Sequence, residues 1–232
     1  MSRAQPKPSS ANYLLLRTLA VQLRTAMHRA FDGRSDLRLL DIGCGSKPYL
    51  EFTQPWVTEY VGLEHEARPG VDVVGLADDL PFPDASFDAV LCSQVLEHVE
   101  EPAAVIREIS RVLRPGGVLF LSTHGSVGYH PNPDDFWRWT HSGLSRLLRT
   151  RGDFAEVAVT PNGGTATTIA YLTGQQLEVF AWKARLGKLL APVVLALNVV
   201  AWSLDRLVLR IMPGRFPTLS PNYLAVAVRP PQ

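Results

Sequence analysis

The sequence has few cysteines and almost no net charge, and both shortages exclude classes of protein. Two of its 232 residues are cysteine, Cys44 and Cys92, and neither lies in a spacing typical of a metal site or a disulfide framework. Lys and Arg together number 23 against 22 Asp and Glu, so no general electrostatic attraction draws the chain to nucleic acid. We therefore expect reduced thiols, a cytoplasmic protein and no nucleic-acid partner.

The sequence also lacks the usual signs of export and of membrane crossing. Its first residues have no basic start, apolar run and small-residue cleavage site, so a secretory signal is unsupported. The apolar, charge-free run over residues 189–204 is shorter than the roughly 20 residues that span a bilayer. We expect Pro192 and Asn198 to interrupt that run. A hydrophobic content of 46% is ample for a core, and we expect a single domain over residues 1–232.

Short apolar strands alternate with helical patterns through most of the chain. An amphipathic helix is expected over residues 10–31, because apolar residues recur there at roughly helical spacing. Further helical patterns follow Glu101-Pro102 and Ser142. The alternation predicts an α/β protein with a Rossmann-like, doubly wound, mostly parallel sheet. The expected strands cover residues 37–42, 59–64, 71–75, 87–92, 118–122, 154–160 and 223–228.

In a sheet of this kind, ligands bind beyond the carboxyl ends of the strands. The loops after residues 42, 64, 92 and 122 are therefore expected to line the site.

The strongest local signal is Asp41-Ile42-Gly43-Cys44-Gly45, which follows an apolar strand. Glycine at two places lets the main chain approach a ligand without a Cβ in the way. An acid in front of the loop suits a ligand with an ammonium group and repels a phosphate, unlike the glycine fingerprint of dinucleotide binders. Glu64 ends the second strand, where a carboxylate can accept hydrogen bonds from ribose hydroxyls. The alternatives are a plain strand-to-helix turn and an exposed acid at a strand end.

Four stretches together resemble the successive motifs of class I S-adenosylmethionine-dependent methyltransferases of the type 11 kind. The resemblance covers about residues 37–123, and more weakly the strands out to residue 228. It implies S-adenosyl-L-methionine as cofactor, a core over residues 37–162, and a seven-stranded sheet whose last strand, 223–229, is antiparallel. The stretches are Leu-Leu-Asp-Ile-Gly-Cys-Gly at 39–45, Leu-Pro-Phe-Pro-Asp-Ala-Ser-Phe-Asp at 80–88, Leu-Glu-His-Val at 96–99 and Arg-Val-Leu-Arg-Pro-Gly-Gly at 111–117.

The resemblance also implies which residues hold the methionine end of the cofactor. They are Asp41, Gly43 and Gly45 in the glycine loop. Ser93 and Gln94, after the fourth strand, are expected to lie beside the methionine moiety and the methyl sulfonium.

At the nucleoside end, the resemblance places Glu64 on the ribose and the loop over residues 76–79 on the adenine. Many relatives carry Asp where this chain has Leu76. The adenine amine is therefore expected to meet either the Asp78 side chain or the backbone of Ala77 and Asp78.

The acceptor side is expected in residues 123–140, which are rich in His, Pro, Asn, Asp and aromatic residues. The end of this run resembles a His-Pro…Asp-x-x-Arg-(aromatic)-Thr pattern found in a subset of such methyltransferases. Methyl transfer to oxygen needs an acceptor that loses its proton, so a histidine or carboxylate within reach would serve as base. His124 is the first candidate, followed by His130 and Asp135. Alternatively, Asp135 and Arg138 simply pair and hold the loop.

Two further points concern chemistry near this loop. His98 could also serve as a base, but in relatives of this type Glu97-His98 is more often part of the local architecture. No cluster of oxygen ligands in the sequence suggests a metal, and none is expected.

The apolar insertion over residues 163–220 has three interpretations. It is a helical cap that covers an apolar substrate and self-associates, a surface for a partner, or an interfacial membrane anchor. A homodimer and a peripheral membrane contact through residues 163–212 both stay open, and so does membrane association within the cytoplasm.

The leading hypothesis is therefore a methyltransferase that acts on a small-molecule or lipid-linked acceptor. The transfer is expected to be an in-line displacement in a dry site, with a His or Asp base. The alternative is a non-catalytic binding module that keeps the nucleoside pocket and docks a partner or membrane through residues 163–220. A nicotinamide oxidoreductase is a third possibility.

Overall fold

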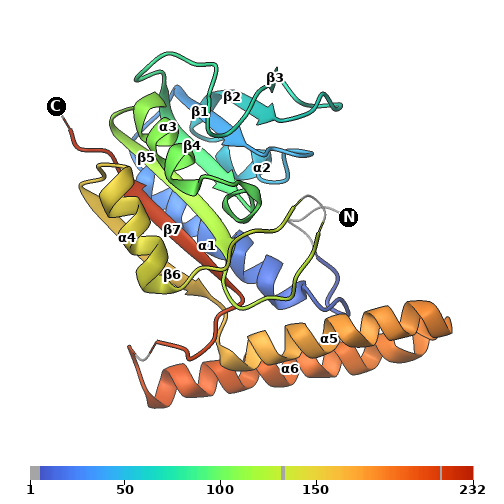
Figure 1. Ribbon diagram of the computed structural model, residues 1–232. Coiled ribbons are helices and arrows are strands. Elements are labelled where there is room, and N and C mark those ends of the chain that lie inside the picture. Colours follow the sequence, from blue (N-terminus) through green and yellow to red (C-terminus); the bar gives the residue numbers. More distant parts are fainter. Residues whose placement is uncertain (1–5, 132–133, 215, 232) are drawn as a thin grey trace. The chain divides into compact units, whose positions relative to one another are not determined.

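The computed structural model describes residues 6–131, 134–214 and 216–231, which fall into two compact units (Figure 1). One unit contains the described residues up to Gln22, Gly125–Gly128 and Pro161–Asn222. The other contains the described residues of Leu23–His124, Tyr129–Thr160 and Tyr223–Gln232. This division does not test the expectation of one domain, which stays a prediction.

The larger unit is built on a seven-stranded sheet with the strand order β3-β2-β1-β4-β5-β7-β6 (Figure 1). The first five strands in this order pair in parallel. The strands are β1 (Leu37–Ile42), β2 (Val57–Glu64), β3 (Val73–Val74), β4 (Phe87–Ser93), β5 (Leu113–His124), β6 (Glu156–Asn162) and β7 (Asn222–Val228).

The strand β7 runs against both of its neighbours. The amide of Arg229, just after β7, donates to the Gly117 carbonyl near the start of β5 (2.9 Å). Likewise, the amide of Ala155, just before β6, donates to the Val228 carbonyl at the end of β7 (2.9 Å). The predicted α/β class and the antiparallel last strand are thus confirmed.

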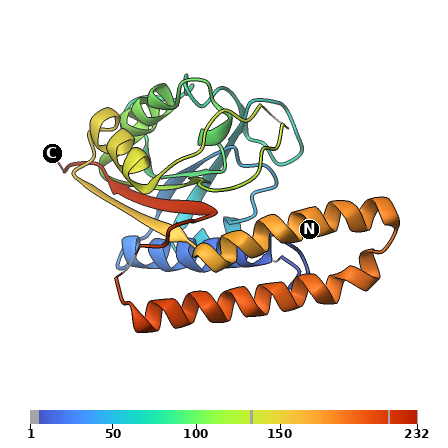
Figure 2. The ribbon, with the colours of Figure 1, turned by 60° about the horizontal axis from the view of Figure 1, so that its bottom comes forward.

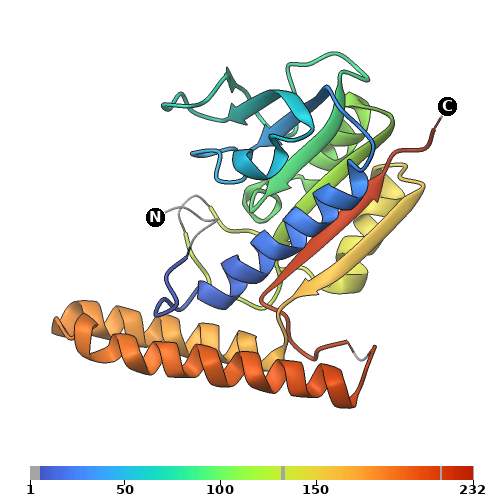
Figure 3. The same ribbon diagram turned by 180° about the vertical axis from the view of Figure 1, so that it is seen from behind.

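Helices cover both faces of this sheet. On one face lie α3 (Pro102–Val112) and α4 (His141–Arg151), whose buried leucine, isoleucine and valine side chains join the core of β1, β4 and β5 (Figure 3). On the other lies the last part of α1 (Tyr13–Ala30), followed by Phe31, whose ring meets Phe120 of β5 edge-on at 5.5 Å. The central strands are therefore buried on both faces, as their continuous apolar sequences require.

Some element boundaries differ from the sequence-based expectation. The strand β5 begins at Leu113 rather than at residue 118, so the Pro-Gly-Gly stretch that ends α3 already belongs to the strand. Gly116 there has φ +73°, and its amide donates to the Arg229 carbonyl (3.1 Å), so pairing with the C-terminal segment extends the strand. Two short helices were not anticipated: α2 (Leu50–Thr53) and the 3-10 helix η1 (Leu96–His98).

The smaller unit is dominated by two long helices, α5 (Thr165–Ala184) and α6 (Gly187–Ile211), which run side by side as a hairpin (Figures 2 and 3). Arg185, with φ +56°, ends α5 in the left-handed conformation and starts the turn. Buried contacts between Leu14, Ala170 and Ala201 tie the two helices to the beginning of α1.

Pro192 and Asn198 interrupt the apolar run but not the helix, because α6 continues through both. Pro192 is near the start of the helix, so the carbonyl that loses a hydrogen bond is that of Lys188, in the exposed first turn where water can reach it. The Asn198 amide is satisfied from outside the helix, by the carbonyls of Pro8 (2.9 Å) and Ser10 (3.0 Å).

Candidate functional site

The glycine loop lies at the carboxyl edge of the parallel sheet, directly after β1. Gly43 (φ +68°) and Gly45 (φ +50°) both adopt the left-handed conformation that glycine favours. A Cβ at Gly43 would collide with the side chain of Val95, whereas a Cβ at Gly45 would meet nothing within 4 Å. The backbone at Gly45 therefore faces open space, as a loop that receives a ligand at close range requires.

Asp41 is buried beside this loop and is held by a neighbouring strand. Its Oδ2 atom accepts a hydrogen bond from the hydroxyl of Tyr60 at 2.5 Å. Burial, and after it the charge of Asp41, raises the pKa of Tyr60, so the hydroxyl keeps its proton and donates. Sequence reasoning missed Tyr60, although alternation along β2 places it on the same face as Glu64.

Glu64 connects the end of β2 to the glycine loop. Its Oε1 accepts a hydrogen bond from the Gly45 amide at 2.9 Å, and its Oε2 lies 3.3 Å from Nδ1 of His65. The two predicted cofactor residues Gly45 and Glu64 are therefore brought into direct contact.

The loop over residues 76–79 forms a tight turn, in which Leu76 and Asp79 make an isolated antiparallel bridge. Asp78 is exposed and Ala77 is half-buried. The side chain of Leu76 is 58% exposed. Contact of Ala77 or Asp78 with adenine stays a prediction.

Ser93 and Gln94 are joined to the next strand through a residue that sequence reasoning missed, Ser122. The hydroxyl oxygens of Ser93 and Ser122 lie 2.9 Å apart, and the Gln94 side-chain amide donates to Ser122 Oγ at 3.2 Å. Gln94 itself has φ +60°. Because β4 and β5 are parallel neighbours, an apolar strand ending in serine was the available signal for Ser122.

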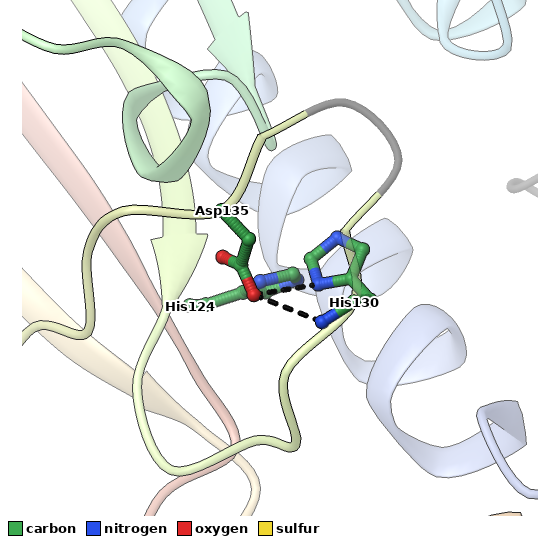
Figure 4. Close-up of side chains that lie close together, drawn as sticks. All are labelled: His124, His130 and Asp135. Atoms are coloured by element: carbon green, nitrogen blue, oxygen red, sulfur yellow. Dashed lines mark hydrogen bonds and ion pairs between the residues drawn. The ribbon is translucent and has the colours of Figure 1, made fainter.

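The three predicted acid–base residues come together at the end of β5 and in the loop that follows it (Figure 4). One nitrogen of His124, one nitrogen of His130 and one carboxylate oxygen of Asp135 all lie within 4.8 Å of one another. The ring centroids of the two histidines are 4.9 Å apart. These residues are separated in the sequence, and the fold of the loop brings them close together.

Asp135 is fixed by an arginine and by the backbone of the same loop. It accepts hydrogen bonds from Nη1 (2.6 Å) and Nη2 (2.5 Å) of Arg138 and from the His130 amide (3.0 Å), and its oxygen lies 3.2 Å from His130 Nδ1. The Arg138 guanidinium holds the pKa of this carboxyl well below its usual range. Asp135 is thus a permanent anion that orients His130, and it is a poor carrier of protons.

His124 has the opposite character. Burial, and after it the nearby charges of His130 and Arg138, lower its pKa from 6.5 to about 3. Its Nδ1 lies 3.4 Å from Oε1 of Glu97, a side chain with no exposed surface. The imidazole is therefore neutral at pH 7 and is able to accept a proton.

The Leu-Glu-His-Val stretch at residues 96–99 contacts the histidine loop and holds it in place. Glu97 Oε2 accepts from the Thr123 hydroxyl (2.8 Å), and the Glu97 carbonyl accepts from the amides of Phe136 (2.8 Å) and Trp137 (3.2 Å). The ring of His98 meets that of His130 edge-on at 5.0 Å. Glu97 is therefore the anchor of the loop. A structural role for Glu97-His98 was expected from the sequence, but its partners were not, because they lie more than one element away.

Aromatic side chains follow the histidines along the loop. The rings of Trp137 and Trp139 stack at 5.9 Å, and the Trp137 indole donates to the Val99 carbonyl at 2.8 Å. Phe136 and Tyr129 are exposed. The loop thus offers apolar surface beside a group that accepts protons.

Two histidine nitrogens and a carboxylate oxygen are also ligands that suit a transition metal. Both oxygens of Asp135 are, however, already occupied by Arg138, and the guanidinium charge opposes a cation at that position. The geometry therefore favours proton handling at this cluster over metal binding.

The comparisons with known proteins agree with this geometry. Residues 40–121 match the family described as Methyltransferase domain. A probable S-adenosylmethionine-dependent methyltransferase of Mycolicibacterium smegmatis is 34% identical over 166 residues, which cover 65% of this chain and 63% of that protein. A ubiquinone biosynthesis O-methyltransferase of Xanthomonas oryzae pv. oryzae is 37% identical over 101 residues, 37% of this chain and 42% of that protein.

The chain thus spans less than two thirds of the length of these relatives. Among solved structures, the [4+2]-cyclase SpnF superposes with a TM-score of 0.57 at 21% identity, over 92% of this chain and 82% of that one. That likeness concerns the fold alone. Together with the four ordered motifs and the sheet, the matches show that residues 40–121 carry a methyltransferase domain similar to the class I S-adenosylmethionine-dependent methyltransferases, whose cofactor is S-adenosyl-L-methionine.

Proposed function

We propose that the protein methylates a hydroxyl group of a small-molecule or lipid-linked acceptor, with His124 as the base. The observation that carries this proposal is a neutral, buried histidine at the end of β5, two residues after the serine that contacts Ser93 and Gln94. The expected cofactor contacts and the expected base therefore lie on adjacent loops of one sheet edge.

The residues of the glycine loop fit the two ends of S-adenosylmethionine, which supplies an electrophilic methyl group when bound. The Asp41 carboxylate suits the ammonium of the methionine end, and Glu64 suits the ribose hydroxyls. The open space beside Gly45 leaves room for a ligand against the backbone. The chain's contribution at this end is to hold and orient the donor.

On the acceptor side, His124 takes the proton that the acceptor hydroxyl loses as its oxygen gains the methyl group. Glu97 lies beside the imidazole, with its Oε1 3.4 Å from Nδ1 of His124, and orients the ring. Asp135 and Arg138 position His130 against the same ring. The exposed aromatic residues of the loop suit an apolar or aromatic acceptor, in keeping with the relative that is named an O-methyltransferase.

A second candidate is a binding module that keeps the cofactor pocket without catalysing transfer. It is favoured by the low pKa of His124, which makes the imidazole a weak base, and by the large exposed apolar surface of α5 and α6. In that case the exposed surface of α5 and α6 would dock a partner or membrane.

The test has a binding step and a transfer step. Calorimetry with S-adenosylhomocysteine is expected to show binding by the wild type, and Asp41→Ala should weaken it about 10- to 100-fold, since a charge-assisted hydrogen bond contributes about 1.5–3 kcal/mol. No binding by the wild type would overturn the methyltransferase proposal.

Transfer is then measured with isotope-labelled S-adenosylmethionine and a panel of phenolic and aliphatic hydroxyl acceptors. His124→Ala should keep cofactor affinity and lower transfer by about 10²–10⁴-fold. His28→Ala is the matched control, because His28 lies on α1 and packs on Trp56 away from the cluster. The binding module would be favoured if the wild type and the His124→Ala variant bound the cofactor equally well and neither transferred a methyl group to any acceptor.

A further inference from the structure

The hairpin of α5 and α6 exposes an unusual amount of apolar surface. Trp182 is 80% exposed, Leu189 66% and Ile211 64%. In the most apolar 18-residue stretch of α6, 17% is buried, so α6 is not a core helix. By length and composition alone, α6 could cross a membrane. The other large exposed apolar residues of the hairpin are Ile169, Val179, Phe180, Leu186, Val193, Leu195, Val199, Val200, Trp202, Leu204, Leu207, Val208 and Leu209.

One acidic side chain of the hairpin turns inward instead. Asp205, on α6, accepts hydrogen bonds from the amides of Gly164, Ala166 and Thr167, each at 3.0 Å. These amides open α5 and have no partner within that helix, so the carboxylate caps α5 and locks the two helices together at one end.

Asn198 lies buried in the middle of the hairpin. It is 3% exposed and donates to the carbonyls of Pro8 and Ser10. Glu178, which is exposed, accepts a hydrogen bond from the Ala11 amide at 2.7 Å. A buried carboxamide beside many exposed apolar side chains departs from the pattern of a helix that faces water.

The charges at the two ends of the hairpin are basic. Lys183, Arg185 and Lys188 lie at the turn, and Arg206 and Arg210 lie near the end of α6, all of them exposed. The acidic residues of the segment 163–214 are Glu178, which is exposed, and Asp205, which is half-buried, and both accept hydrogen bonds from backbone amides.

Arg206 shows how such a cation meets the apolar surface. Its guanidinium lies 4.5 Å above the ring of Trp202, with both side chains exposed. A tryptophan paired with an arginine suits the boundary between lipid tails and headgroups, where the ring is buried and the cation reaches phosphate.

We propose that the α5–α6 hairpin binds the surface of a lipid bilayer that contains anionic lipids, with α6 lying in the plane of the interface. The charge-free run over residues 189–204 is about 24 Å long at 1.5 Å per residue, which is less than the roughly 30 Å thickness of the hydrocarbon layer. The helix therefore fits along the interface, with basic residues at both ends on the headgroups. This binding does not rest on methyl transfer.

The main experiment is flotation of the full chain with phosphatidylcholine vesicles, with and without about one third phosphatidylglycerol. The wild type should float with the anionic vesicles. Val200→Glu should weaken binding by about tenfold or more, since a carboxylate is costly in lipid. Val21→Glu is the matched control and should float like the wild type, because Val21, on α1, is 56% exposed just as Val200 is.

Two further measurements separate lipid binding from misfolding and from self-association. Replacing Lys183, Arg185 and Lys188 by Gln should remove the preference for anionic vesicles, at about fivefold per residue. In the wild type, brominated lipids should quench a fluorescence component that Trp202→Phe removes.

The proposal would be overturned if the wild type stayed out of the floating fraction at all lipid concentrations. Light scattering that showed a homodimer disrupted by Val200→Glu and not by Val21→Glu, together with no flotation, would assign the surface to a second copy of the chain. Equal flotation of the Val200→Glu and Val21→Glu variants would exclude the hairpin as the binding surface.

Discussion

The sheet of the larger unit and the hairpin of the smaller one sort their side chains in opposite ways. In the sheet, Phe120 and its apolar neighbours are buried and the charged groups form pairs at the edges. In the hairpin, the carboxylate of Asp205 is turned inward while Phe180 and Trp202 face outward. The sheet therefore has the side-chain arrangement of a protein surrounded by water, whereas the hairpin presents side chains that suit contact with an apolar surface.

The largest expected difference between the two units is in the free energy of unfolding of two matched substitutions. Phe120→Ala should lower the free energy of unfolding by about 3–5 kcal/mol, because it leaves a cavity in the core. Phe180→Ala, at a side chain that is 58% exposed, should change it by less than about 0.5 kcal/mol while weakening vesicle flotation. Urea denaturation of both variants measures the difference. A similar loss of stability in both would mean that Phe180 is packed in solution.

A smaller effect is expected from the inward-facing acid of the hairpin. Asp205→Ala removes the cap on three amides of α5 and should cost about 1–2 kcal/mol. Hydrogen exchange should become faster at the first turn of α5. Ser203→Ala, two residues earlier on the exposed side of α6, serves as control and should leave that exchange unchanged.

The smallest effect is a pH dependence that belongs to the sheet. The pKa of His124 is about 3 in the folded chain against an ordinary value of 6.5, so between these values the unfolded chain binds a proton that the folded chain does not. Stability is therefore lost as pH falls from about 6.5 towards about 3, at no more than about 1.4 kcal/mol per pH unit. Thermal unfolding of His124→Gln between pH 7 and pH 5 should show a shallower slope than His28→Gln. Equal slopes would contradict a buried, neutral His124.

The glycine loop was predictable from the sequence because its chemistry is local. The order of apolar strand, acid and two glycines needs only a few consecutive residues, and the positive φ angles of Gly43 and Gly45 follow from that order. The strands were predictable for the same reason, since β1 begins and ends where its apolar run does.

The features that sequence reasoning missed depend on distant partners. Tyr60 and Ser122 gain their roles only from pairing between strands, and Glu97 gains its role from a loop that folds back over it. Asn198 stood out only as a polar residue in an apolar run, because its partners, Pro8 and Ser10, lie at the other end of the chain. His124, His130 and Asp135 were named as separate candidates, and only the closed loop shows that they form one cluster.

Asn198 donates hydrogen bonds to the carbonyls of Pro8 and Ser10, and the Ala11 amide donates one to Glu178, so the start of the chain covers polar groups of the hairpin. Without these residues, the buried Asn198 amide would need water in the midst of an apolar surface. Deletion of residues 8–11 should therefore make the hairpin less ordered and more prone to aggregation. An affinity tag is accordingly better placed after the last strand than before the first helix.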